Sequence, residues 1–124
     1  DGRAAILSCN RQDVRLDSER FRYHGGVVGG REDLRSDCEP IAAGIAAAFP
    51  GLWGLVGVDL VETSRGLVVL EVNPRVTTSY VGLRRALGRN PAELVVGLAA
   101  DGWEAVRLSP VAGEVEVSVD AGTQ

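Results

Sequence analysis

Two acidic residues interrupt a pair of strongly apolar segments in the middle of the chain. Asp59 lies within Leu55–Glu62, Glu71 lies within Leu67–Val72, and Ser64-Arg65-Gly66 separates the two segments. Such a spacing is typical of two strands joined by a short hairpin turn. Because burying a carboxylate inside an apolar strand is costly unless its charge is compensated, we expect the two acids to share a partner.

The register of this hairpin decides whether the two acids meet. A three-residue turn with Gly66 in the left-handed region predicts that Asp59 lies opposite Glu71 on one face of the sheet. The same register predicts these further pairs: Thr63 with Leu67, and Val61 with Val69. Opposed side chains lie about 5 Å apart, so two ionised carboxylates would repel each other there. A divalent cation removes that repulsion, and hard oxygen ligands favour magnesium.

Two further polar residues continue the same two-residue period after Glu71. Asn73 would add a neutral oxygen to a cation site, and Arg75 would bring a guanidinium that can hold a phosphate or a carboxylate. The alternative is that Asp59 and Glu71 lie on an edge strand and are solvated or paired with arginine. Four polar groups in one phase within apolar strands favour a combined metal and anion site.

A hydroxyl-rich segment follows, because Pro74 has no N–H to donate to the ladder and ends the strand. The segment contains Thr77, Thr78 and Ser79, which are candidates either for substrate contacts or for ordinary loop and helix-capping roles. The sequence leaves both roles open.

The rest of the chain divides into helices and strands according to its hydrophobic period and its glycines and prolines. The sequence predicts helices at Ser36–Phe49, Tyr80–Leu87 and Pro91–Ala99, and further strands at Ala4–Ser8, Phe21–Gly30, Trp103–Leu108 and Val115–Val119. Paired glycines in the second of these strands indicate a bend or bulge, and the last two strands are expected to pair with each other. We interpret the polar segment Asn10-Arg11-Gln12 as a loop, with a place in the cleft as the alternative.

The same pattern predicts how the elements pack. Ile41, Gly44, Ile45 and Ala48 form one apolar helix face. The hairpin strands are apolar on both faces, which predicts a position in the interior of a sheet. A short hairpin implies antiparallel pairing, so the predicted fold class is α+β, a largely antiparallel sheet with flanking helices.

Composition excludes several classes of protein. The chain has 124 residues, which predicts one domain, and its net charge of −4 argues against nucleic-acid binding. All 13 of its Lys and Arg positions are arginine, so a Walker A loop, a Schiff-base lysine and a lysine general base are excluded. The apolar run Ile41–Phe49 is too short to span a membrane and no leader is recognised, so we expect a cytoplasmic protein without a membrane partner. Cys9 and Cys38 lack metal-ligand spacing, and a disulfide between them is disfavoured in a reducing compartment.

The segment from Pro50 to Asn90 resembles the ATP-grasp superfamily. The matching pattern is Asp59, then eleven residues, then Glu71-Val72-Asn73-Pro74-Arg75, and it is flanked by PGLWGLVGVDL and TTSYVGLR. These flanks are most similar to the subgroup of carboxylate–amine ligases that includes the tyramine–glutamate ligases. Some family members carry an arginine two residues before the first acid, where this chain has Gly57.

The resemblance implies an ATP-dependent ligase that joins a small carboxylic acid to an amine through an acyl phosphate. It implies that Asp59, Glu71 and Asn73 bind the Mg²⁺ ions that bridge the ATP phosphates, with Mn²⁺ as an alternative ion. It also implies that Arg75 is catalytic and contacts the transferred phosphoryl group or the acyl phosphate.

ATP-grasp enzymes hold ATP between two lobes, using lysines that lie upstream of this pattern, and the present chain contains no lysine. We therefore interpret residues 1–124 as a single domain that forms the C-terminal part of an ATP-grasp unit and is incomplete at its N-terminal edge. An upstream ATP-grasp lobe would be its partner, and the chain alone would be inactive. The alternative is a non-catalytic ATP-grasp-like fragment or remnant that serves as a metal-binding or interaction domain.

Overall fold

The computed structural model describes residues 2–119, which form an α+β fold with antiparallel sheets, as predicted. One sheet has three strands in the order β1-β2-β5, formed by Arg11–Asp17, Arg20–Val28 and Val115–Ser118. The other sheet pairs β3 (Gly57–Thr63) with β4 (Gly66–Asn73). The helices are α1 (Arg35–Ala48), α2 (Tyr80–Leu87) and α3 (Pro91–Asp101), and short 3-10 turns lie at Glu32–Leu34 (η1) and Trp103–Ala105 (η2).

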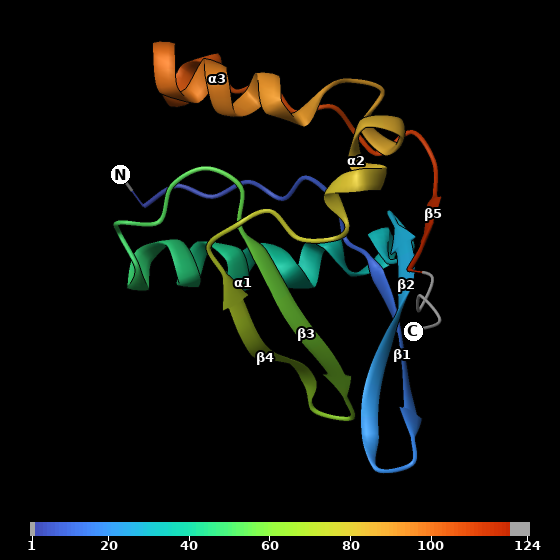
Figure 1. The fold of residues 1–124 in the computed structure, drawn as a ribbon. Coiled ribbons are helices and arrows are strands. Elements are labelled where there is room, and N and C mark those ends of the chain that lie inside the picture. The colour runs from blue at the N-terminus through green and yellow to red at the C-terminus, as the bar shows by residue number, and fades with distance from the viewer. Residues whose placement is uncertain (1, 120–124) are drawn as a thin grey trace.

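The two hairpins of the fold point in the same direction. In Figure 1 the turns of β1–β2 and β3–β4 lie at one end of the molecule, whereas α2 and α3 lie at the opposite end. The open end of the second hairpin, where Gly57 pairs with Asn73, is therefore directed toward the helices. Within residues 2–119 we find no helix of the length and apolarity needed to cross a membrane.

The hydrophobic core lies between α2 and the β2–β5 part of the larger sheet. Its buried members are Val28, Leu83, Ala86, Leu87 and Val115. Gly82 allows α2 to approach the strands, since a Cβ at this position would lie 2.8 Å from a methyl group of Val28. Because α2 follows directly after the hydroxyl-rich segment, the core also anchors that segment.

The predicted bulge lies in β2, at the glycines that indicated it. The register of β1 on β2 shifts between Asp13 and Val14, which leaves His24 as the extra residue of β2. Gly25 follows with φ +130°, and a Cβ there would lie 2.1 Å from the carbonyl oxygen of Val117 on β5. Glycine is needed here because a third strand passes close to the bulged backbone.

The N-terminal segment is where the predicted strands differ most from the structure. Residues 4–8 form no strand, and two of their carbonyl groups are bound by a side chain instead: Arg35 donates to the carbonyl oxygens of Ile6 and Leu7. The segment interpreted as a polar loop instead begins β1, so Gln12 is a strand residue. The chain before β1 is thus held by α1 rather than by a neighbouring strand.

The C-terminal pair of strands was also predicted wrongly. Trp103–Ala105 is a 3-10 turn, and β5 pairs with β2. The helices predicted at Tyr80–Leu87 and Pro91–Ala99 are confirmed; the first ends at Gly88 in the left-handed region, and the second continues to Asp101. In α1 the buried residue is Ala46, whereas Gly44 and Ala48 of the predicted apolar face are exposed. A run of alanines gives the helix little contrast between its faces, which explains the misplaced stripe.

Candidate functional site

The β3–β4 hairpin brings the two acids together, as predicted, through a different turn. Asp59 lies opposite Glu71, but Thr63 pairs with Gly66, which leaves a two-residue turn. The Thr63 hydroxyl donates to the carbonyl oxygen of Gly66 at 2.8 Å and accepts from the backbone N–H of Arg65 at 3.2 Å, so it closes the tighter turn. Gly66 has the predicted positive φ, at +111°.

A bulge in β4 compensates for the shorter turn. The predicted pairs of Thr63 with Leu67 and Val61 with Val69 are wrong, and the observed pairs are Glu62 with Leu67, Val61 with Val68 and Leu60 with Val69. Leu70 is the extra residue, and beyond it the register returns to the pairing that places Asp59 opposite Glu71. The turn is one residue shorter than predicted and the bulge adds one residue to β4, so the two differences cancel and Asp59 still pairs with Glu71.

The hairpin does not lie in a sheet interior in the part of the chain that the structure describes. Its sheet has two strands, and the exposed apolar residues on them are Val61, Val68, Val69 and Leu70. Within residues 2–119, no neighbouring strand therefore buries the apolar faces of this hairpin.

A chain of hydrogen bonds joins three of the predicted site residues. The Asn73 amide Nδ2 donates to Asp59 Oδ2 at 3.4 Å, and the Arg75 guanidinium donates to Asn73 Oδ1 at 3.3 Å. Asn73 is buried, Asp59 is half-buried, and Glu71 and Arg75 are exposed. The Arg75 guanidinium thus contacts the Asn73 amide. Glu71 is exposed to solvent, which agrees, for this one acid, with the alternative of a solvated edge strand.

Asp59 has a second polar partner that the sequence did not identify. Gln12 on β1 donates from Nε2 to Asp59 Oδ1 at 2.8 Å. Burial, and to a lesser extent the negative charge of Asp59, raise the pKa of the Tyr23 phenol on β2. No motif in the sequence indicates the contact of Gln12 with Asp59, since it crosses between separate sheets; the available signal was the polar segment that contains Gln12.

The hydroxyl-rich segment packs against the start of β3. A Cβ on Gly57 would lie 2.4 Å from the Cγ2 methyl of Thr77, so this contact requires glycine. The carbonyl oxygens of Thr77, Thr78 and Ser79 accept from the N–H groups of Tyr80, Val81 and Gly82 and so open α2. The Ser79 side chain makes no capping hydrogen bond at this helix start. These backbone roles leave the side-chain roles of the three residues to be tested.

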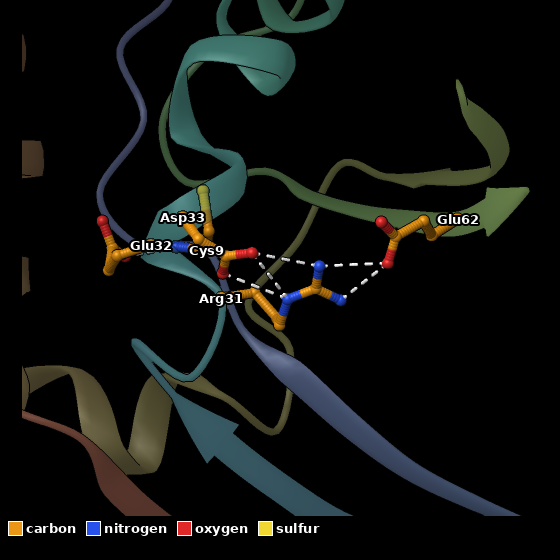
Figure 2. Close-up of polar contacts among 5 residues, drawn as sticks. All are labelled: Cys9, Arg31, Glu32, Asp33 and Glu62. Carbon is orange, nitrogen blue, oxygen red and sulfur yellow. Dashed lines mark hydrogen bonds and ion pairs between the residues drawn. The ribbon is translucent and has the colours of Figure 1, made fainter. Parts of the chain in front are cut away.

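A cluster of charged residues connects β3 to the segment that follows β2. The Arg31 guanidinium lies between Asp33, at 3.1 Å, and Glu62 of β3, at 3.0 Å (Figure 2). Its hydrogen bonds hold the pKa of Asp33 below the usual value. In the same region Glu32 accepts from the backbone N–H of Cys9 at 2.7 Å and pairs with Arg35. These contacts fix β3 relative to the junction of β2 and η1.

The donor set at the acidic pair fits a hard cation better than a soft one. Asp59, Glu71 and Asn73 offer carboxylate and amide oxygens, which suit Mg²⁺ or Mn²⁺. Among residues 2–119 there is no group of three or more His, Cys, Asp and Glu side chains arranged for a metal ion. The proposed site therefore depends on the amide as its third protein ligand, and Asn73 would bind through the oxygen that now faces Arg75.

Comparison with known proteins decides the family. Residues 1–79, which include every predicted site residue, match the family model of the ATP-grasp domain. This chain belongs to the ATP-grasp family. Similarity to an ATP-grasp solved structure extends further along the chain: a crystal structure from Archaeoglobus fulgidus, provisionally assigned to that superfamily, matches with a TM-score of 0.59 and 29% identity. The match covers 91% of this chain and 37% of that one, and confirms the predicted fold.

The curated relatives of this ATP-grasp chain are ligases. Tyramine–L-glutamate ligase from Methanocaldococcus jannaschii is 34% identical over 92 residues, which cover 73% of this chain and 27% of the relative. The enzyme of the same name from Methanocaldococcus fervens is 32% identical over 78 residues, which cover 63% of this chain and 25% of the relative. The chain thus spans about a quarter of the length of these relatives, and its similarity to ligases of this type is confirmed.

Proposed function

We propose that this chain is the metal- and phosphate-binding part of an ATP-dependent carboxylate–amine ligase that acts through an acyl phosphate. The observation that supports the proposal is the pairing of Asp59 with Glu71 beside Asn73, within the segment that matches the ATP-grasp domain. Residues 1–124 would form a single domain, corresponding to the C-terminal part of an ATP-grasp unit. An upstream lobe would complete the nucleotide site, because the chain has no lysine to contribute to it.

The proposed cation ligands are Asp59, Glu71 and Asn73. A bound Mg²⁺ ion supplies positive charge that offsets the negative charge of the ATP phosphate oxygens. The carboxylates contribute charge, and the buried Asn73 fixes the third position because it lies at the last pair of the hairpin, opposite Gly57. Exposure of Glu71 leaves room for a nucleotide phosphate on its side of the site.

Arg75 is the proposed catalytic residue. In the reaction, a carboxylate oxygen of the acid substrate bonds to the γ-phosphorus of ATP, the bond to the β–γ bridging oxygen breaks, and ADP leaves. The amine then attacks the carbonyl carbon of the acyl phosphate, phosphate leaves, and the amine nitrogen loses a proton to give the amide. Arg75 would stabilise the negative charge on the transferred phosphoryl oxygens, and its exposed side chain needs only to release two long hydrogen bonds, to Asn73 at 3.3 Å and to the Val76 carbonyl at 3.2 Å.

Thr77, Thr78 and Ser79 are the proposed substrate-contacting residues. They follow Arg75 in the segment between β4 and α2, and Thr78 is exposed while Thr77 packs on Gly57. Their hydroxyl groups can donate to or accept from a carboxylate or an amine. A non-catalytic metal-binding or interaction domain is the second candidate, which is favoured by the exposed Glu71.

Calorimetric titration with Mg²⁺ and a non-hydrolysable ATP analogue, on a protein that joins this chain to its upstream lobe, tests the proposal. Removing a formal charge from the cation ligands should weaken Mg²⁺-dependent nucleotide binding at least several-fold in Glu71→Gln and in Asp59→Asn. Glu116→Gln, at an exposed position of β5, is the matched control and should bind like the wild type. Equal binding by the wild type and Glu71→Gln would contradict the proposed site.

A further inference from the structure

Gln12 reaches the acidic hairpin from the other sheet. It lies near the start of β1, where it pairs across the strands with Gly26 of β2. A Cβ on Gly26 would lie 2.3 Å from the carbonyl oxygen of Arg11, so the glycine permits the close strand approach at this point. From there the Gln12 amide crosses to β3 and donates to Asp59 Oδ1 at 2.8 Å.

We propose that Gln12 is a positioning residue that holds the Asp59 carboxylate in the orientation required for cation binding; the inference rests on the proposed function. Gln12 donates to one carboxylate oxygen and Asn73 donates to the other, so together they fix the rotation of the carboxylate. A carboxylate accepts at about four lone-pair sites, and these two hydrogen bonds leave the rest for a ligand.

One side chain of the β1–β2 hairpin thereby takes part in the proposed site. The hairpin that carries the acids and the hairpin that orients one of them belong to different sheets. Correct orientation of Asp59 therefore depends on how the two sheets are held together, which Arg31 does through Glu62.

Groups that orient a metal ligand without touching the metal typically change metal affinity by about 10- to 100-fold when removed. Gln12→Met keeps the length of the side chain and removes its hydrogen-bonding groups, and Gln12→Ala also removes the packing. Both should weaken cation binding by about tenfold or more. Arg15→Ala is the matched control, because Arg15 lies on the same strand and pairs with Asp13 at the surface.

The contact itself is tested first in the metal-free chain by NMR. The side-chain amide signals of Gln12 are assigned by their absence from the spectrum of Gln12→Met. They should shift in Asp59→Asn, because the charged acceptor is lost. Unchanged Gln12 amide signals in Asp59→Asn would overturn the inference without any reference to metal.

The effect of Gln12 on cation affinity is then measured by Mn²⁺ titration, in which free Mn²⁺ is followed by its electron paramagnetic resonance signal. Support requires about tenfold weaker binding in Gln12→Met and Gln12→Ala, wild-type binding in Arg15→Ala, and thermal midpoints within a few degrees of the wild type. Wild-type affinity in Gln12→Met, together with lost binding in Asp59→Asn, would overturn the role of Gln12 and leave the cation site intact. If Asp59→Asn binds as the wild type does, or the wild type does not bind, the proposed cation site fails and the inference fails with it.

Discussion

At the scale of single residues, Asn73 connects the two parts of the proposed chemistry. Its amide nitrogen contacts Asp59, a proposed cation ligand, and its oxygen contacts Arg75, the proposed phosphoryl-binding group. Burial makes this amide a fixed point between two more accessible charged side chains. A cation at Asn73 Oδ1 would use the oxygen that Arg75 now contacts, so on the proposed assignment we expect Arg75 to move when the cation binds.

Arg75→Lys tests the assignment of Arg75 to the transition state. Lysine keeps the charge and loses the planar fork, so in an active protein that joins this chain to its upstream lobe, turnover should fall by roughly ten- to a thousandfold. The Michaelis constant for ATP should rise much less. Single-turnover phosphate release measures the effect, and thermal unfolding provides the control.

The alternative for Arg75 is a purely structural role on Asn73. In that case the substitution would lower the melting temperature and impair all kinetic constants together. Since the side chain is exposed and its hydrogen bonds are 3.2 and 3.3 Å long, we expect little change in stability. A stable variant with normal turnover would remove Arg75 from the chemistry.

Cys9 gives a pH dependence that belongs to the fold rather than to the site. Burial, followed by the nearby Cys38 and Glu32, raises the pKa of its thiol from 9.0 to about 12. The unfolded thiol ionises near pH 9 while the native thiol stays neutral, so the stabilisation from Cys9 is complete below pH 9 and is lost as the pH rises toward 12.

Urea unfolding between pH 8 and 11 measures this loss. Above pH 9 the free energy of unfolding of the wild type should fall relative to that of Cys9→Ala, by about 1 kcal/mol per pH unit. Parallel pH profiles for the two proteins would show that the native thiol ionises as readily as the unfolded one.

At the scale of elements, the start of β3 and the segment before α2 fit together through one contact. Gly57 lies under the Thr77 methyl, with no room for a Cβ. The contact joins the first residue of β3 to the hydroxyl-rich segment, and α2 then anchors that segment on the core. It also explains why an arginine cannot occupy this position without moving Thr77.

Gly57→Ala should therefore destabilise the chain by about 1–3 kcal/mol, the usual cost of overpacking. Thr77→Ser removes the obstructing Cγ2 methyl, so the double variant Gly57→Ala/Thr77→Ser should recover most of that loss. Urea unfolding of the wild type, both single variants and the double variant measures the coupling. Additive effects of the two substitutions would contradict the contact.

Local patterns predicted the elements better than their pairing. The pairing of Asp59 with Glu71 and the positive φ of Gly66 were predicted correctly, but the Thr63 hydroxyl closes a shorter turn and Leu70 supplies an unforeseen bulge. The turn depends on a side-chain hydrogen bond and the bulge on one extra residue, and the alternation of apolar and polar residues predicts neither. The predicted strand at residues 4–8 is absent, and Arg35, far away in sequence, binds two of its carbonyl groups instead.

At the scale of the whole molecule, the proposed site draws side chains from two sheets. The sequence could predict the residues on β3 and β4, because they share one period along the chain. It could not predict Gln12, which reaches Asp59 from the other hairpin and whose contact depends on tertiary packing. The exposed apolar residues on both hairpins would suit a contact with the proposed upstream partner.

The central claim is that Asp59, Glu71 and Asn73 bind one divalent cation, and anomalous diffraction locates such an ion directly. Crystals of a protein that joins this chain to its upstream lobe, grown with MnCl₂ and a non-hydrolysable ATP analogue, would be measured at the manganese absorption edge. The account predicts an anomalous peak in contact with oxygen atoms of all three residues, and loss of that peak in Glu71→Gln. A Mn²⁺ peak elsewhere on the molecule, with no peak between Asp59 and Glu71, would contradict it.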